Sequence, residues 1–230
     1  MPADPRLIVA LDLPTADEAR ALVARLGDSA CFYKVGLELF ATGGMDLARE
    51  LKASGKQVFL DWKLHDIGAT VQRAAAALAN AGCGDLLTVH AEPQVMKAAV
   101  QGRGRSGLKV LAVTVLTSLS DADLEEVGYH ESARALVERR IHQAVAAGCD
   151  GVVASPHEAE LARKIGGAGF LVVTPGVRPD WAAKNDQARA ATPREALQSG
   201  ASHLVVGRPI TAANDPAQAA QHILAEIAGV

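Results

Sequence analysis

Aromatic residues and clustered positive charge are both scarce in this chain. Aromatic side chains make up 3% of its 230 residues, and its formal net charge is −3. A protein that binds nucleic acid usually presents a basic stripe, often with aromatic side chains between the basic ones. The sequence contains no such stripe, which argues against nucleic acid as a partner.

Long apolar runs are absent as well. The longest ones have the length of a strand, whereas a membrane-spanning helix needs about 20 apolar residues. Residues 1–6 lack the charged and then apolar layout of a secretion signal. We therefore expect no membrane partner.

Cysteine is rare. Cys31, Cys83 and Cys149 are odd in number and far apart. They form neither a disulfide framework nor the CxxC spacing of a metal site. Together with the missing secretion signal, this favours a soluble, cytoplasmic protein with reduced thiols.

What the chain does contain is a regular alternation of short apolar runs with Ala-rich amphipathic stretches. The apolar runs predict strands at residues 7–13, 31–37, 57–63, 86–90, 109–116, 151–154, 170–174 and 203–206. The amphipathic stretches predict helices at about residues 14–27, 44–54, 67–81, 94–101, 132–147, 156–165, 193–199 and 216–228, with a small extra helix at 121–127.

Eight strand–helix units without a linker-like change in composition predict one α/β domain over residues 1–230. Strands joined by helical crossovers form a parallel sheet with helices outside it. Eight such units match the size of a (β/α)8 TIM barrel, a parallel eight-stranded barrel with outer helices. A doubly wound open sheet is the alternative. It would normally carry a GxGxxG fingerprint after the first strand, where this chain reads DLPTAD from Asp12.

The third predicted strand ends in charged residues. Because side chains alternate along a strand, Asp61 and Lys63 share one face and lie side by side. Asp66 follows where the strand should have turned. Charges rarely end an apolar strand for packing alone, so this group indicates a functional site. The alternative is an exposed ion pair, with Asp66 as the cap of the next helix.

Polar residues also follow other predicted strands. Asp12, Lys34 and His90 end the first, second and fourth strands, and chemistry in such a barrel belongs at this end. Thr117 and Ser118 follow the fifth strand. Each has a structural alternative: Asp12 could cap a helix, Lys34 could form a stabilising ion pair, and the two hydroxyl residues could belong to an ordinary turn. His90 is more typical of a hydrogen-bonded structural histidine, and we leave it outside the catalytic set.

The last two strands end in residues suited to a phosphate group. Gly207 lets a phosphate approach backbone N–H groups, and Arg208 can bind it through two parallel hydrogen bonds. The loops after strands seven and eight are the usual phosphate site of such barrels, and Arg178 falls in the same quadrant. The long segment between these strands, which contains Gln187, has the length of a lid.

The sequence shows no metal or cofactor site. His65 and Asp66 adjoin, but a third ligand at a recognisable spacing is missing. An alternating Asp/Lys array neutralises itself without a divalent ion. No Ser/His/Asp triad is visible, and no cysteine stands in a catalytic context. We therefore expect a protein that works without metal or cofactor.

The charged segment resembles the signature of a known family. Its pattern, Asp61-x-Lys63-x-x-Asp66-Ile67-x-x-Thr70, is similar to that of the orotidine 5′-phosphate decarboxylases. The resemblance extends along the whole chain, through residues 9–12, 32–36, 116–118, 174–179 and 206–210.

This resemblance implies a (β/α)8 barrel that works as a homodimer without cofactor or metal. It implies decarboxylation of orotidine 5′-phosphate to UMP and CO2, the last step of de novo pyrimidine nucleotide synthesis. Carried over by motif, the charged catalytic network consists of Lys34, Asp61, Lys63 and Asp66. Lys63 would be the proton donor to C6 of the pyrimidine, and Asp61 would lie against the substrate carboxylate.

The resemblance also implies the remaining substrate contacts. Asp66, Ile67 and Thr70 would reach into the partner subunit's site. The other implied contacts are Asp12 and Lys34 to the ribose, Thr117 and Ser118 to the pyrimidine, and Arg178, Gln187, Gly207 and Arg208 to the phosphate.

Two other functions remain as alternatives. Keto-gulonate-phosphate decarboxylases and hexulose-phosphate synthases share the Asp-x-Lys-x-x-Asp core but use Mg²⁺ on a sugar phosphate. Ile67, Thr70 and the turn at 116–118 favour the nucleotide enzyme. A barrel that binds a phosphate ligand without catalysis would lack one of the charges of the network, and none is lacking.

Overall fold

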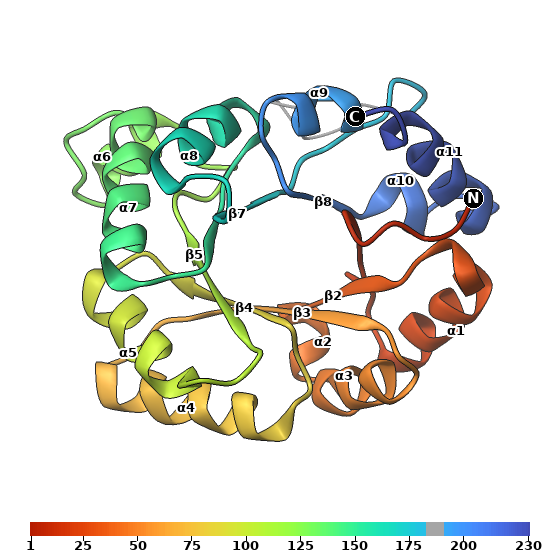
Figure 1. Cartoon of the computed structure of the whole chain (residues 1–230), viewed down its shortest axis with the longest axis horizontal. Coiled ribbons are helices and arrows are strands. Elements are labelled where there is room, and N and C mark those ends of the chain that lie inside the picture. Colours follow the sequence, from red (N-terminus) through yellow and green to blue (C-terminus); the bar gives the residue numbers. More distant parts are fainter. Residues whose placement is uncertain (183–190) are drawn as a thin grey trace.

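A closed barrel of eight parallel strands forms the centre of the computed structural model, which describes residues 1–182 and 191–230. Neighbouring strands pair in chain order, and β1 pairs with β8 to close the ring (Figure 1). The strands are β1 (Leu7–Ala10), β2 (Phe32–Gly36), β3 (Gln57–Leu64), β4 (Leu86–His90), β5 (Lys109–Val113), β6 (Gly151–Val153), β7 (Leu171–Thr174) and β8 (His203–Val206). The predicted (β/α)8 barrel is confirmed, and the doubly wound open sheet is excluded.

Helices surround the ring of strands (Figure 1). The longer ones are α1 (Ala16–Leu26), α3 (Gly44–Ala53), α4 (Gly68–Ala81), α5 (Pro93–Arg103), α7 (Ala133–Ala147), α8 (Ala159–Gly166) and α11 (Pro216–Ile227). The shorter ones are α2 (Leu37–Phe40), α6 (Asp121–Glu126), α9 (Pro193–Gln198) and α10 (Arg208–Thr211), with 3₁₀ turns at Gly27–Ser29 and Pro156–Glu158.

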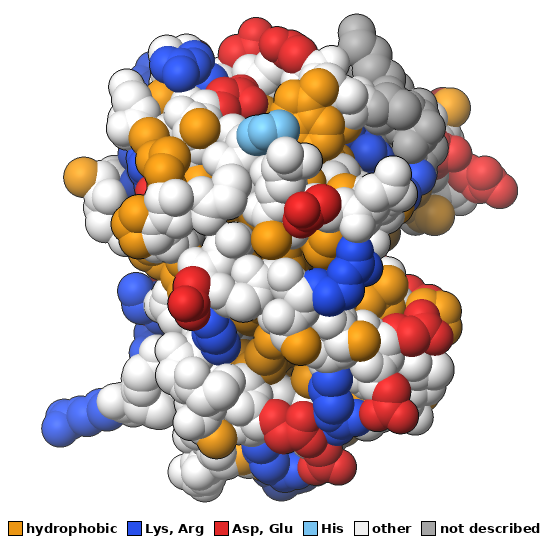
Figure 2. Space-filling view, turned by 90° about the vertical axis from the view of Figure 1, so that its right-hand side faces the viewer, with side chains coloured by type: hydrophobic (Ala, Val, Ile, Leu, Met, Phe, Trp, Pro, Cys, Tyr) orange, Lys and Arg blue, Asp and Glu red, His pale blue; other side chains and the backbone are white. Residues whose placement is uncertain are grey.

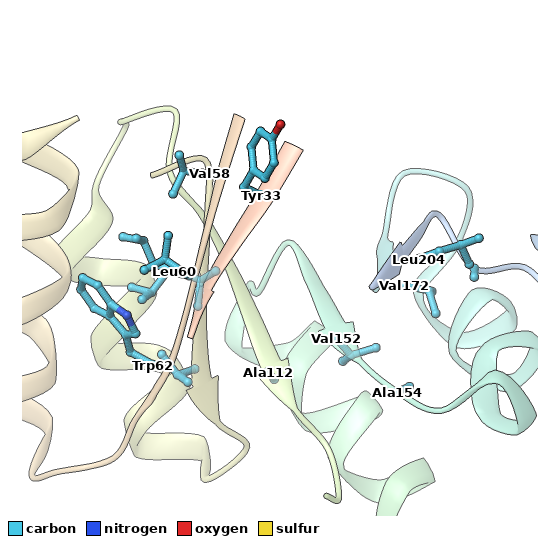
Figure 3. Packing of buried hydrophobic residues seen from close by; sticks show 14 of the residues in the cluster. Tyr33, Val58, Leu60, Trp62, Ala112, Val152, Ala154, Val172 and Leu204 are labelled. Atoms are coloured by element: carbon cyan, nitrogen blue, oxygen red, sulfur yellow. The ribbon is translucent and has the colours of Figure 1, made fainter. Parts of the chain in front are cut away.

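Alternation along the strands divides the apolar side chains into two layers. The layer inside the barrel consists of Ile8, Ala10, Phe32, Phe59, Leu86, Leu111, Val173 and Val205. The outer layer packs between strands and helices, and Figure 3 shows part of it, from Tyr33 and Val58 across to Val172 and Leu204. Neighbouring residues of β3 alternate between the two layers, because Leu60 belongs to the outer layer and Phe59 to the inner one.

Two strands end earlier than predicted. β1 stops at Ala10 instead of residue 13, and β5 stops at Val113 instead of residue 116. Beyond each end a further backbone bond is present, from Leu11 N to Lys34 O (2.9 Å) and from Thr114 N to Val153 O (3.3 Å). The chain then leaves the ladder to form the loops at the barrel's rim. Apolar residues in these loops made the strands look longer in the sequence.

The helical predictions differ in three places. Helices α2 and α10 span four residues each and are too short to show a helical period. The helix predicted over residues 156–165 is divided into a 3₁₀ turn and α8. The Glu158 carboxylate accepts the Ser155 N–H at 2.8 Å, which tightens the first turn.

Strand β3 carries an irregularity that the alternation rule does not predict. Its pairing with β4 shifts between Leu60 and Leu64, and Lys63 has a φ of 48°. Among the described residues other than glycine, Lys63 alone has a positive φ. The left-handed conformation costs a non-glycine residue about 1–2 kcal/mol. Bulges of this kind often lie next to active sites, where they re-aim a side chain.

Neither a membrane span nor a disulfide occurs within the described residues. No helix there is long and apolar enough to cross a membrane. Cys31, Cys83 and Cys149 are unbonded. On the face shown in Figure 2, Lys and Arg side chains are interspersed with Asp and Glu rather than gathered into a stripe.

Candidate active site

A cavity of about 540 Å³ lies at the carboxyl ends of the strands. Its lining includes the predicted site residues Asp12, Lys34, Asp61, Lys63, Arg178, Gly207 and Arg208. A smaller, more apolar cavity of about 180 Å³ shares Lys34, Asp61 and Lys63 and adds Thr117. The barrel thus gathers residues from both ends of the sequence around one space, as the strand-end rule predicts.

Four charged side chains form a continuous network in this cavity. The Lys34 Nζ donates to Asp12 Oδ1 at 2.7 Å and lies 3.4 Å from Asp61 Oδ2. The Lys63 Nζ donates to Asp61 Oδ1 at 2.8 Å. Asp61 therefore lies between two ammonium groups. Its side chain is 14% exposed and that of Lys63 is 26% exposed, so the alternative of an exposed ion pair is wrong.

The surroundings of Asp61 keep its carboxylate charged. Burial alone would raise the pKa of this carboxyl group. The ammonium groups of Lys34 and Lys63, with hydrogen bonds from Lys63 and Thr88, outweigh burial and hold the pKa below its ordinary value. The group is thus fully ionised at neutral pH.

Thr88 of β4 also belongs to this network, although it is not among the site residues predicted from the sequence. It is fully buried, accepts the Lys63 N–H at 3.0 Å and donates its hydroxyl to Asp61 Oδ1 at 2.9 Å. Leu86 points into the barrel, so Thr88 occupies the next inward position of β4. A hydroxyl at an inward position beside a charged strand is the signal that could have identified it.

Gly36 leaves room for the pair between Asp12 and Lys34. A Cβ at this position would lie 2.7 Å from Asp12 Oδ1 and 2.9 Å from Lys34 Nζ. Both distances are too short for any side chain, so the end of β2 must be a glycine if the two charged groups are to keep their places.

Asp66, Ile67 and Thr70 do not line either cavity described above. Asp66 and Ile67 are exposed just before α4, with Ile67 at 69%, and Thr70 is half-buried in the helix's first turn. The Asp66 carboxylate accepts the adjacent Ile67 N–H at 2.6 Å, and within the described residues it forms no ion pair. The N-cap of α4 is Ile67, without a side-chain hydrogen bond, so Asp66 as the helix cap is also wrong.

The other predicted residues have mixed placements. Arg178 is buried at the cavity, with its backbone N–H bonded to Ala191 O at 2.9 Å. Ser118 is exposed and lines neither cavity. Gln187 lies outside the described residues. Asp12 does not cap the first helix, because Thr15 does so by accepting the Glu18 N–H at 3.2 Å.

His90 lies outside both cavities. Its ring is 4.9 Å from that of His65, centroid to centroid. Burial lowers the pKa of His90 below its ordinary value, so its imidazole is neutral at neutral pH. The ring contact with His65 and the neutral imidazole fit a packing role for His90.

The charged groups that line the cavity are carboxylates, ammonium groups and the guanidinium groups of Arg178 and Arg208. Within the described part of the chain, no three His, Cys, Asp or Glu side chains converge in a way that could hold a metal ion. Because each carboxylate of the network already faces an ammonium group, its negative charge is compensated by the protein itself.

A (β/α)8 barrel with an Asp/Lys network and two arginines at the carboxyl ends of its strands defines the class: a barrel protein built to hold an anionic ligand. Comparison with known proteins identifies the family. Residues 5–223 match the model described as "Orotidine 5′-phosphate decarboxylase / HUMPS family". The chain belongs to this family.

Individual relatives resemble the chain over its full length. It is 69% identical over 234 residues to the "Orotidine 5′-phosphate decarboxylase" of Caulobacter vibrioides, covering 100% of both chains. It is 56% identical to the protein of the same name from Rhodopseudomonas palustris, covering 99% of this chain and 97% of that one. A crystal structure of orotidine 5′-phosphate decarboxylase from Lactobacillus acidophilus is 40% identical, with a TM-score of 0.85, and covers 97% of this chain and 99% of that one.

The space at Gly36 gives a first prediction. In Gly36→Ala, the new Cβ should push apart the ends of Asp12 and Lys34, which are flexible and can move without disturbing the barrel. We expect the 2.7 Å hydrogen bond to be lost in a crystal structure, with a cost of about 1 kcal/mol or less in unfolding free energy. Gly107→Ala is the control, since nothing lies within 4 Å of a Cβ there. An unchanged Asp12–Lys34 distance in Gly36→Ala would contradict the prediction.

Proposed function

We propose that the chain decarboxylates orotidine 5′-phosphate to UMP and CO2 in this cavity, with Lys63 as the proton donor to C6. The activity is that of an orotidine-5′-phosphate decarboxylase, EC 4.1.1.23, as family membership and 69% full-length identity to a decarboxylase indicate. The observation that supports the proposed roles is the position of Asp61, held at the cavity between Lys34 and Lys63.

The chemistry explains why this arrangement suits the reaction. When the bond from C6 to the carboxylate breaks, its electron pair stays on C6 of the ring, which has no attached electron sink. The site must therefore supply fixed positive charge where the negative charge develops. The Lys63 ammonium supplies it, and one of its N–H protons then forms the new C6–H bond. Lysine regains its proton from solvent.

Asp61 has two roles in this proposal. It fixes the two ammonium groups through contacts at 2.8 and 3.4 Å. It also lies against the substrate carboxylate, and the repulsion between the two negative groups is relieved as CO2 leaves. Because its pKa is below the ordinary value, Asp61 is charged throughout the neutral pH range.

The rest of the cavity binds the parts of the substrate that do not react. We assign the ribose hydroxyls to Asp12 and Lys34, which approach each other at the cavity wall. We assign the remaining contacts to Thr117 and Ser118 at the pyrimidine and to Arg178, Gln187, Gly207 and Arg208 at the phosphate. Binding energy from the phosphate can then stabilise the transition state at a distance from C6.

We also propose that the site is shared between two copies of the chain in a homodimer. Asp66, Ile67 and Thr70 carry the second half of the motif, yet they lie outside their own cavity. Within the described residues Asp66 forms no ion pair, and Ile67 beside it is 69% exposed; such a pair of side chains is suited to a partner's site. In this arrangement Asp66 completes the partner's Asp/Lys network.

We propose a metabolic place and a cellular compartment for the reaction. UMP formation by decarboxylation is the last step of de novo pyrimidine nucleotide synthesis, and we propose that it takes place in the cytoplasm. The Asp/Lys network supplies the electrostatic stabilisation itself, so the proposal includes no metal and no cofactor.

Lys63→Ala tests the proton donor. We expect kcat for orotidine 5′-phosphate to fall by about 10⁴-fold or more, since the variant lacks both the positive charge and the proton. The loss of absorbance on decarboxylation measures turnover, and Lys97→Ala, on the exposed side of α5, should match the wild type. Near-normal turnover in Lys63→Ala would contradict the assignment.

Treatment of the wild type with EDTA tests whether the reaction depends on a metal ion. Loss of wild-type activity in EDTA, restored by Mg²⁺, would favour the sugar-phosphate alternative.

Mixing two inactive variants tests the shared site. In a dimer of Lys63→Ala with Asp66→Asn, one site receives both defects, whereas the other takes Lys63 from one chain and Asp66 from the other and is intact. We expect activity to return when subunits exchange, with up to one working site per mixed dimer. If mixed dimers form, as native mass spectrometry can establish, and remain inactive, Asp66 serves its own subunit.

A further inference from the structure

The hydroxyl of Thr88 closes a ring of hydrogen bonds around the Asp61–Lys63 pair. It accepts the backbone N–H of Lys63 at 3.0 Å and donates to Asp61 Oδ1 at 2.9 Å. The same Asp61 oxygen accepts from Lys63 Nζ at 2.8 Å. Thr88 is fully buried and lines neither of the two cavities that hold the site, so we expect it to act through Asp61 and Lys63 rather than by touching the substrate.

The bulge in β3 explains why a side chain is needed at this point. The β3–β4 register runs from Phe59 opposite Leu86 to Leu60 opposite Leu87, and then shifts before Leu64. Within the shift, Lys63 takes a φ of 48°, and its N–H bonds to a side chain instead of a strand carbonyl. The Thr88 oxygen thus replaces the missing acceptor and stabilises a backbone conformation that is otherwise unfavourable for lysine.

The direction of both hydrogen bonds is fixed by chemistry. A backbone N–H can only donate, so the Thr88 oxygen accepts from Lys63. The hydroxyl proton is then free for the Asp61 carboxylate, which can only accept when ionised. Hydrogen bonds to a charged group are stronger than neutral ones, and both ends of this one are buried or nearly so.

We propose that Thr88 is a positioning residue for the decarboxylation: its hydroxyl ties the Lys63 backbone to the Asp61 carboxylate and thereby fixes the Lys63 ammonium over C6 of the substrate. This inference rests on the proposed function, in which Lys63 donates the proton. A lysine side chain has four rotatable bonds, so its ammonium is placed accurately only if the backbone and the partner carboxylate are both fixed. Small displacements of a reacting group cost large factors in rate.

The same hydroxyl influences the charge of Asp61. Among the described residues, the charged groups that pair with this carboxylate are Lys34 from β2 and Lys63 from β3, and Asp12 is linked to it through Lys34. The hydrogen bond from Thr88 adds to these in lowering the Asp61 pKa. Its removal should raise that pKa, so the acid limb of the pH profile of kcat should move to higher pH.

The test compares Thr88→Val, which removes the hydroxyl at constant shape, with Thr88→Ser, which keeps it. For Thr88→Val we expect kcat to fall about 10- to 100-fold, the effect of one hydrogen bond to a charged group, with KM within about threefold of the wild type. Thr88→Ser should restore kcat to within about threefold. Thr114→Val is the matched control, because it loses a buried hydrogen bond of 3.0 Å, to Val153 O, away from the network.

A purely structural role predicts a different pattern. Thr88→Val would then lose stability as Thr114→Val does, but keep the wild-type kcat and pH profile, which would overturn the proposal. Should Thr88→Val not fold, Thr88→Cys carries the same comparison, since a thiol donates only weakly. A crystal structure of the variant is a readout independent of activity. Lys63 should leave its φ of 48°, and an unchanged φ together with an unchanged 2.8 Å distance from Lys63 Nζ to Asp61 Oδ1 would contradict the proposal.

Different outcomes would overturn the proposed function and the role of Thr88. A wild-type protein without activity on orotidine 5′-phosphate overturns the proposed function, and the role of Thr88 with it. An active wild type with an equally active Thr88→Val overturns the role of Thr88 alone.

Discussion

The carboxylate of Asp61, largely buried between the ammonium groups of Lys34 and Lys63, is the interaction on which the site depends. Burial opposes its charge, and the two lysines compensate for that cost. Removing one partner from such a buried pair leaves an uncompensated charge, at a cost of about 3–5 kcal/mol. The three charged groups therefore depend on one another for their stability. In the proposed reaction, the Lys63 ammonium of this network is the fixed positive charge next to C6, where negative charge develops.

The barrel supplies the geometry that a single segment could not. Asp12 and Arg208 are at opposite ends of the sequence, yet they line one cavity because β1 pairs with β8. Two local departures from regular structure then shape the site. Gly36 leaves space for the Asp12–Lys34 pair, and Lys63 donates to Asp61 from within the bulge of β3. The regular strands form the barrel, and the irregular positions at Gly36 and Lys63 influence where the charged side chains lie.

The sequence could predict what depends on periodicity and on the ends of strands. The eight strands, and the gathering of Asp12, Lys34, Asp61, Lys63 and Arg208, follow from these rules. The inward position of its hydroxyl could mark Thr88 as a candidate, but its two hydrogen bonds could not be predicted. They depend on the register between β3 and β4 and on a bulge that leaves no mark in the hydrophobic pattern. The role of Asp66 stays a prediction, since its proposed partner is a residue of another copy of the chain.

The most direct test of this account is a titration of Asp61 itself by ¹³C NMR of its carboxyl group, assigned by the loss of the resonance in Asp61→Asn. If two ammonium groups hold the carboxylate, its midpoint lies below the value of about 3.9 typical of an aspartic acid side chain. The variant Lys34→Met should move the midpoint upward. A wild-type midpoint above the ordinary value would mean that burial outweighs the two lysines, and it would contradict the account of the site.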